Sequence, residues 1–118
     1  MPTTSHSTMV RNLAKSGETI AKEMTGNNAH LLHMAVGISG EAGELLDAVK
    51  KAVVYNKPLD RENVIEELGD LEFYMEGLRQ AVLVSREDVI KANMGKLSKR
   101  YVDFNYTDQA AQTRADKV

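Results

Sequence analysis

Apolar residues recur at helical spacing along four stretches of this chain. No stretch shows the strict alternation of apolar and polar positions that is typical of a half-buried strand. The four stretches run over residues 9–24, 29–54, 60–82 and 85–101, and residues 1–8 and 102–118 lack the pattern. The pattern predicts an all-α fold. We expect an antiparallel four-helix bundle over residues 9–101, a flexible N-terminus at residues 1–8 and a C-terminal extension at residues 102–118.

The composition is that of one globular domain: 118 residues, of which 42% are apolar and 27% are charged. A net charge of −2 leaves no basic field to hold nucleic acid, and the absence of cysteine excludes disulfides, Fe–S ligation and thiol catalysis. No apolar run approaches the roughly 18 residues of a membrane span, and the N-terminal residues do not resemble a signal peptide. We therefore expect a soluble, cytoplasmic protein that binds neither nucleic acid nor membranes.

Two pairs of carboxylates stand out in the second and third predicted helices. Glu41 and Glu44 form one pair, and Glu67 and Asp70 form the other. Residues three apart on a helix have Cβ atoms about 5–6 Å apart, and both pairs lie on the same side of their apolar stripes. Antiparallel packing would bring all four carboxylates to one seam. The alternative is that each pair lies on an ordinary solvated face.

Glycines next to these carboxylates favour the seam over a solvated face. Gly37, Gly40, Gly43 and Gly69 lie inside predicted helices, where each glycine costs about 0.8–1 kcal/mol relative to alanine. Something must come close to the backbone there, either a packed helix or a ligand. Tight helix packing would explain the glycines but would leave the carboxylates unexplained.

Clustered carboxylates repel one another unless cations neutralise them. An all-oxygen ligand set suits Mg²⁺, with Mn²⁺ as the other possibility, and Mg²⁺ is usually shared between protein carboxylates and substrate phosphates. A di-iron bundle would need Glu-x-x-His motifs, which the chain lacks. The residues therefore indicate metal-assisted phosphate chemistry. His30 and His33 fall on the carboxylate side of their helix and are candidates for contacting a base, although a lone histidine is more often a core or surface residue.

The carboxylate motifs resemble those of a known family. Glu41-Ala-Gly-Glu44 and Glu67-Leu-Gly-Asp70 are similar to the paired ExxE and ExxD motifs of the MazG-type, all-α nucleoside triphosphate pyrophosphohydrolases. Asn93-Met-Gly-Lys96-Leu-Ser-Lys-Arg100-Tyr101 resembles the Asn-x-x-Lys-Leu-x-x-Arg-Tyr stretch that closes such domains. The resemblance covers about residues 29–101 and is to the short, single-module members found in phages and bacteria.

The resemblance implies an enzyme that hydrolyses an NTP or dNTP to the monophosphate and pyrophosphate. It implies that Glu41, Glu44, Glu67 and Asp70 hold Mg²⁺, and that the chain forms a homodimer or homotetramer that completes the bundle. Either Glu44 or Glu66 would take the proton from the attacking water. Selective hydrolysis of dUTP or of an alarmone, and a non-catalytic nucleotide-sensing or adaptor module, are the alternatives.

Basic and amide side chains at the rim of the fourth predicted helix complete the candidate site. The resemblance points to Asn93, Lys96 and Arg100 as phosphate-binding residues, whereas position alone favours an ordinary basic helix end. Lys51 projects on the same side as Glu44 and is a further candidate for binding phosphate.

Overall fold

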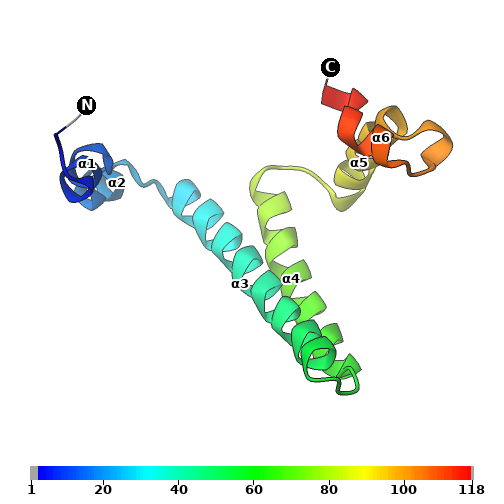
Figure 1. Ribbon diagram of the computed structural model, residues 1–118. Coiled ribbons are helices and arrows are strands. Elements are labelled where there is room, and N and C mark those ends of the chain that lie inside the picture. The colour runs from blue at the N-terminus through cyan, green and yellow to red at the C-terminus, as the bar shows by residue number, and fades with distance from the viewer. Residues whose placement is uncertain (1–2, 118) are drawn as a thin grey trace.

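The computed structural model describes residues 3–117 and is all-helical over that range, as the apolar pattern predicts (Figure 1). Its elements are α1 (His6–Leu13), α2 (Gly17–Glu23), α3 (Gly26–Val54), α4 (Arg61–Ala81), α5 (Arg86–Arg100), η1 (Val102–Phe104), α6 (Asp108–Thr113) and η2 (Ala115–Lys117), where η marks a short 3-10 helix. None of these helices is both long and apolar enough to cross a membrane.

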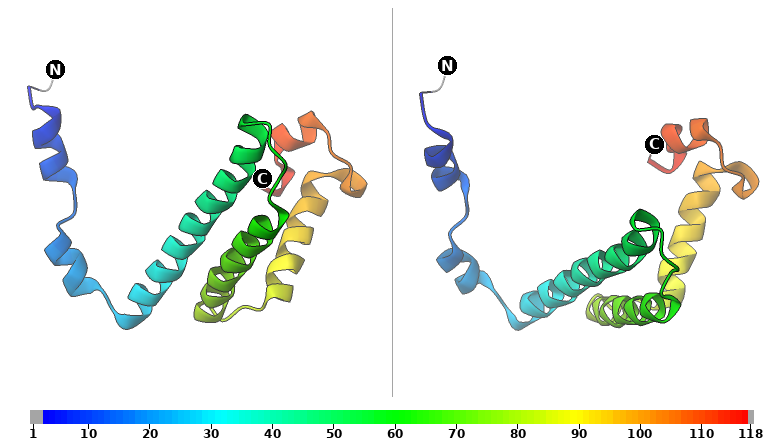
Figure 2. Two further views of the ribbon diagram at one scale, coloured as in Figure 1. Left: turned by 90° about the horizontal axis from the view of Figure 1, so that it is seen from below. Right: turned by 60° about the horizontal axis from the view of Figure 1, so that its bottom comes forward.

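The centre of the fold is an antiparallel pair formed by α3 and α4 (Figures 1 and 2). Both helices have side-chain N-caps: the Thr25 hydroxyl accepts a hydrogen bond from the Asn28 N–H at 3.0 Å, and the Asp60 carboxylate accepts one from Asn63 at 3.1 Å. Met34 on α3 and Glu67 on α4 are among the buried residues of the pair. The pair therefore buries a carboxylate as well as apolar side chains.

Glycine allows the two helices to approach closely at one of the predicted positions. A Cβ on Gly37 would overlap the ring of Tyr74, so glycine is required there for the tyrosine to lie against α3. At Gly40, Gly43 and Gly69 a Cβ would meet nothing within 4 Å. Close approach of a packed helix is thus confirmed for Gly37 and wrong for the other three within residues 3–117, because they lie on faces turned away from the partner helix. Close approach of a ligand to those three glycines stays a prediction.

The first predicted helix, over residues 9–24, is wrong as a single element. It is two short helices, because Ala14 is extended and Ser16 begins α2 by accepting a hydrogen bond from the Thr19 N–H. Moreover, α1 begins at His6, inside the segment expected to be flexible, since Ser5 caps it by accepting from the Thr8 N–H. This N-terminal arm, α1 with α2, projects away from the α3–α4 pair (Figure 2).

The C-terminal third is organised around α5. A capping box begins this helix: Ser85 accepts from the Asp88 N–H, and the Asp88 carboxylate accepts from the Ser85 N–H. The helix then packs mainly against η1, α6 and η2 rather than along α3 or α4. The expected four-helix bundle is therefore not formed by one chain, in which α3 and α4 are the only two long helices in extensive contact within residues 3–117.

Because the N-terminal arm and the C-terminal third make few contacts with the α3–α4 pair, the chain is extended rather than compact. Its radius of gyration is 20.4 Å, whereas a compact domain of this length has about 13.5 Å. Its accessible surface is 9,722 Å², against about 6,400 Å² for a folded monomer of this mass. One chain thus leaves about 3,300 Å² more surface exposed than a compact monomer does.

Candidate metal centre

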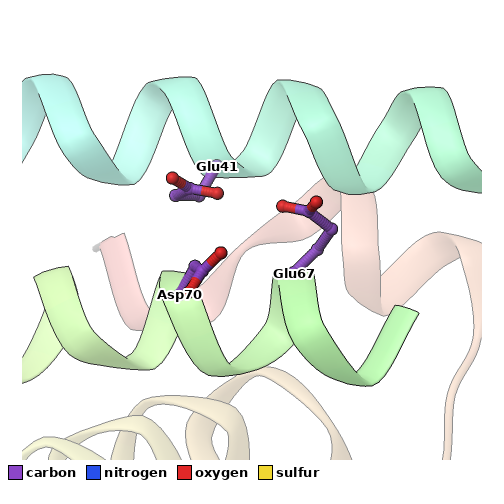
Figure 3. A group of neighbouring side chains, drawn as sticks. All are labelled: Glu41, Glu67 and Asp70. Carbon is purple, nitrogen blue, oxygen red and sulfur yellow. The ribbon is translucent and has the colours of Figure 1, made fainter. Parts of the chain in front are cut away.

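Three carboxylates meet between α3 and α4. Glu41 reaches the seam from α3, and Glu67 and Asp70 reach it from α4 (Figure 3). One carboxylate oxygen from each residue lies within 4.8 Å of the other two. The antiparallel pairing and the i, i+3 spacing on α4 together produce this convergence.

Two of these carboxylates each have one oxygen without a hydrogen-bond partner. Glu67 is only 9% exposed and Glu41 is half-buried, and one Oε2 atom on each is buried without a hydrogen-bond donor. Burial raises the pKa of Glu67 to about 7, and the neighbouring Glu41 and Glu44 raise it further. Burial also raises the pKa of Glu41, as do the charges of Glu44 and Asp70. The ionised cluster is therefore unfavourable without a counter-charge.

This donor set fits a hard divalent cation. All the donors are carboxylate oxygens, which suit Mg²⁺ or Mn²⁺. Oxygens bound at about 2.0–2.1 Å from Mg²⁺ lie no more than about 4.2 Å apart, so small side-chain movements would close the present spacing around an ion. A cation would also satisfy the two unpartnered oxygens.

The fourth predicted ligand lies at the edge of this group. Glu44 is exposed, and its charge contributes to the raised pKa values of Glu41 and Glu67, but it is outside the three-residue group. Glu66, the other candidate for the general base, is also exposed. Both are therefore accessible to water beside the carboxylates.

Tyr74 is a residue of this region that sequence reasoning missed. It follows Asp70 by one helical turn, packs over Gly37 and contacts His33 edge-on, with ring centroids 6.1 Å apart. Phe73 contacts Tyr74 edge-on at 5.2 Å. The i, i+4 spacing from Asp70 was the signal that could have found it.

The two histidines lie near this aromatic group, as their position on the carboxylate side predicts. His33 contacts Tyr74, and His30 lines a cavity of about 330 Å³. Met34, Phe73, Glu76, Gly77 and Gln80 line the rest of that cavity. The pair thus places aromatic and apolar surface further along the helices from the carboxylates.

The predicted phosphate-binding residues are not gathered at the carboxylates of their own chain. Lys51 is exposed and pairs with Asp47 at 3.0 Å. Arg100 pairs with Asp116 of η2 at 2.9 Å, and their side chains are only 15% and 5% exposed. Asn93 and Lys96 are exposed on α5, which does not pack along the α3–α4 pair.

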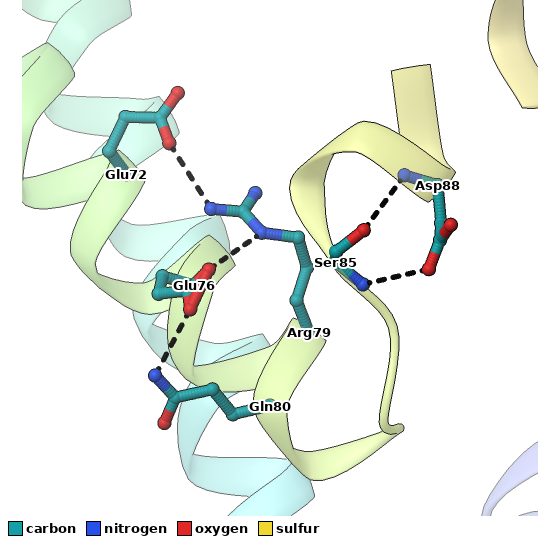
Figure 4. A network of polar contacts seen from close by, with 6 residues as sticks. All are labelled: Glu72, Glu76, Arg79, Gln80, Ser85 and Asp88. Atoms are coloured by element: carbon teal, nitrogen blue, oxygen red, sulfur yellow. Dashed lines mark hydrogen bonds and ion pairs between the residues drawn. The ribbon is translucent and has the colours of Figure 1, made fainter. Parts of the chain in front are cut away.

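A second polar network, which the sequence did not indicate, lies near the α4–α5 connection (Figure 4). Arg79 is buried and contacts Glu76 at 3.1 Å and Glu72 at 3.5 Å, while Gln80 donates to Glu76 at 3.0 Å. These hydrogen bonds lower the pKa of Glu76. The network pairs a buried guanidinium with two carboxylates, which offsets the cost of burying its charge.

The comparison with protein families shows which family includes this chain. The model of the MazG nucleotide pyrophosphohydrolase domain matches residues 29–104. The chain belongs to this family. Its MazG domain covers α3, α4, α5 and η1, and leaves the N-terminal arm and α6 outside. No match was found among curated proteins or among solved structures.

Membership of the MazG family indicates nucleotide pyrophosphohydrolase activity. The three-carboxylate cluster lies inside the matched residues.

Proposed function

We propose that the chain hydrolyses an NTP or dNTP to the nucleoside monophosphate and pyrophosphate, with Mg²⁺ bound at the cluster of Glu41, Glu67 and Asp70. The observation that carries this proposal is the convergence of three carboxylates with two buried oxygens that have no partner. Mn²⁺ would fit the same oxygen ligands.

In this proposal Glu41, Glu67 and Asp70 hold the metal, and Glu44 completes the ligand set when it turns inward. Bound Mg²⁺ would offset the charge of the triphosphate and lower the pKa of a bound water. Glu66 or Glu44, whichever is free of metal, accepts the proton as the water oxygen attacks phosphorus. The α–β phosphoanhydride bond breaks, and the leaving phosphate oxygen carries away the electron pair.

The remaining predicted contacts belong to the same proposal. The helix that carries Asn93, Lys96 and Arg100 does not reach the carboxylates of its own chain. In a homodimer or homotetramer these residues would therefore bind the phosphates of a nucleotide held at the carboxylates of a second copy. Lys51 would reach the phosphates after leaving Asp47. His30 and His33, with Tyr74, would contact the nucleoside.

Pyrophosphate release tests the proposal. The wild-type protein should release pyrophosphate from a mixture of the common NTPs and dNTPs with Mg²⁺ and should stop when a chelator is added. Glu41→Gln keeps the side-chain volume and should abolish release. Glu62→Gln, on an exposed residue in the first turn of α4, is the matched control and should leave release unchanged.

Unchanged release from the Glu41→Gln variant, or release that a chelator does not affect, would disprove the metal assignment. No release from any nucleotide by a folded wild-type protein would favour the non-catalytic module.

A further inference from the structure

The N-terminal arm lacks the packing that its helices need. α1 has 8 residues and α2 has 7, and isolated helices shorter than about 12–15 residues are marginal in water. Within residues 3–117, neither helix packs extensively against another element. Met9 and Leu13 lie one turn apart on α1, and Leu13 is 76% exposed. A surface outside the chain is needed to cover this apolar face.

The α3–α4 pair exposes a complementary surface, which we call the apolar side. Three apolar residues of α3 are rotated about the helix axis to one side of the stripe that faces α4: Leu46, Val49 and Val53. Glu44 is rotated to the other side of that stripe. Leu68 and Met75 of α4 are displaced to the side where these three residues lie. Leu46 is 67% exposed. The apolar side therefore lies across the helix pair from Glu44, and Leu46 and Val53 on it are largely exposed within residues 3–117.

A cavity of about 250 Å³ continues the apolar side toward the α4–α5 connection. Its lining is almost wholly aliphatic, apart from Arg79: Ile38, Met75, Leu78, Val82, Val84 and Val89. An unfilled aliphatic cavity at a helix junction favours insertion of an apolar side chain.

The exposed surface of one chain is large enough to form an interface with a second copy. The excess of about 3,300 Å² per chain is more than the roughly 1,000–2,500 Å² that each partner of an obligate complex buries, so it is large enough for such an interface. Each copy carries both the arm and the apolar side, so a two-fold arrangement makes the same contact twice. The small net charge of −2 offers little electrostatic resistance to pairing.

We propose that the N-terminal arm of each chain packs on the apolar side of a second copy. This arrangement leaves the carboxylate side of the pair open to substrate. The proposal pairs a segment outside the MazG domain with a surface inside it, and it stands whether or not the chain hydrolyses nucleotides.

The first test measures association of the full-length chain by sedimentation equilibrium, without nucleotide or metal. The wild-type chain should be a dimer or larger at micromolar concentration. Leu13→Glu on the arm and Leu46→Glu on the apolar side should each raise the dissociation constant at least tenfold. Gln112→Glu, which adds the same charge to an exposed position on α6, should not change it.

Hydrogen exchange separates docking of the arm from association elsewhere. The amides of α1 and α2 should be protected in the associated protein and should lose protection on dilution. A monomeric wild-type chain, unprotected arm amides in the dimer, or a dimer that Leu13→Glu or Leu46→Glu leaves intact would each overturn the proposal.

Cross-linking gives a readout that does not depend on how charged variants fold. The chain contains no cysteine, so Leu13→Cys and Leu46→Cys can be prepared in separate chains and mixed. A flexible bismaleimide should join the two chains to each other. Absence of that product, in a mixture that forms dimers, would overturn the arrangement.

Discussion

Glu41 on α3 and Glu67 on α4 face each other across the helix pair, and each has one buried carboxylate oxygen without a hydrogen-bond donor (Figure 3). Two such oxygens in one seam destabilise the metal-free protein when both groups are ionised. In the proposed metal-bound state these oxygens would become ligands, so metal binding should couple to stability as well as to activity.

The stability of the metal-free protein should fall as the pH rises from 5 to 8. The pKa of Glu67 is raised from 4.5 to about 7 in the folded state, so the folded protein favours the protonated form more than the unfolded chain does. Mg²⁺ should reverse the loss at pH 8. Melting temperatures with a chelator and with Mg²⁺ measure both effects, and an unchanged pH slope in Glu67→Gln would contradict this explanation.

Asp70→Asn should weaken Mg²⁺ binding more than Glu44→Gln does. Asp70 belongs to the group of three converging oxygens, whereas Glu44 lies at its edge. Because loss of outer-shell residues typically costs 10–100-fold in metal affinity, loss of Asp70 should cost about 100-fold or more. Calorimetric titration with Mg²⁺ measures this difference. Equal affinities in the two variants would show that the three-residue group is not the binding site.

Alanine substitutions at two glycines of α3 should have opposite effects on the free energy of unfolding. Gly37→Ala forces a methyl group into the Tyr74 ring and should destabilise the protein by about 1–3 kcal/mol. Gly40→Ala meets no neighbour and should stabilise it by about 0.5–1 kcal/mol through helix propensity. Urea unfolding measures both values. Destabilisation by Gly40→Ala would mean that another surface covers this face.

Asp116→Asn should release η2 from α5. Arg100 lowers the pKa of Asp116 and holds its carboxylate at 2.9 Å. The contact therefore stabilises η2 above the unfolded pKa near 3.8 and weakens as the pH falls through the lower folded value. Hydrogen exchange at neutral pH should be faster at residues 115–117 in the variant. Equal exchange rates would show that other contacts hold the segment.

A nucleotide panel at equal concentrations separates a general activity from a selective one. A general pyrophosphohydrolase should act on several nucleotides at rates within tenfold of one another. Preference for dUTP or for an alarmone above tenfold would favour the selective alternative.

Tyr74→Ala should raise KM more than it lowers kcat, because in the proposal the ring contacts the nucleoside rather than the reacting phosphate.

The sequence by itself determined the helices around the site and the side of each helix on which the acids lie. This was possible because helical periodicity is local: three residues always advance about one turn, so Glu67 and Asp70 share a face wherever the helix packs. The division of residues 9–24 into two helices was missed because the apolar spacing obscured the start signal at Ser16.

Only the tertiary structure decided which groups meet. It placed Glu41 against Glu67 and Asp70, put Tyr74 over Gly37, and kept α5 away from the carboxylates of its own chain. Contacts between helices depend on which apolar surfaces find a partner, and short loops do not specify that choice. For the same reason, the exposed apolar side and the N-terminal arm became visible only once the packing of α3 and α4 was known.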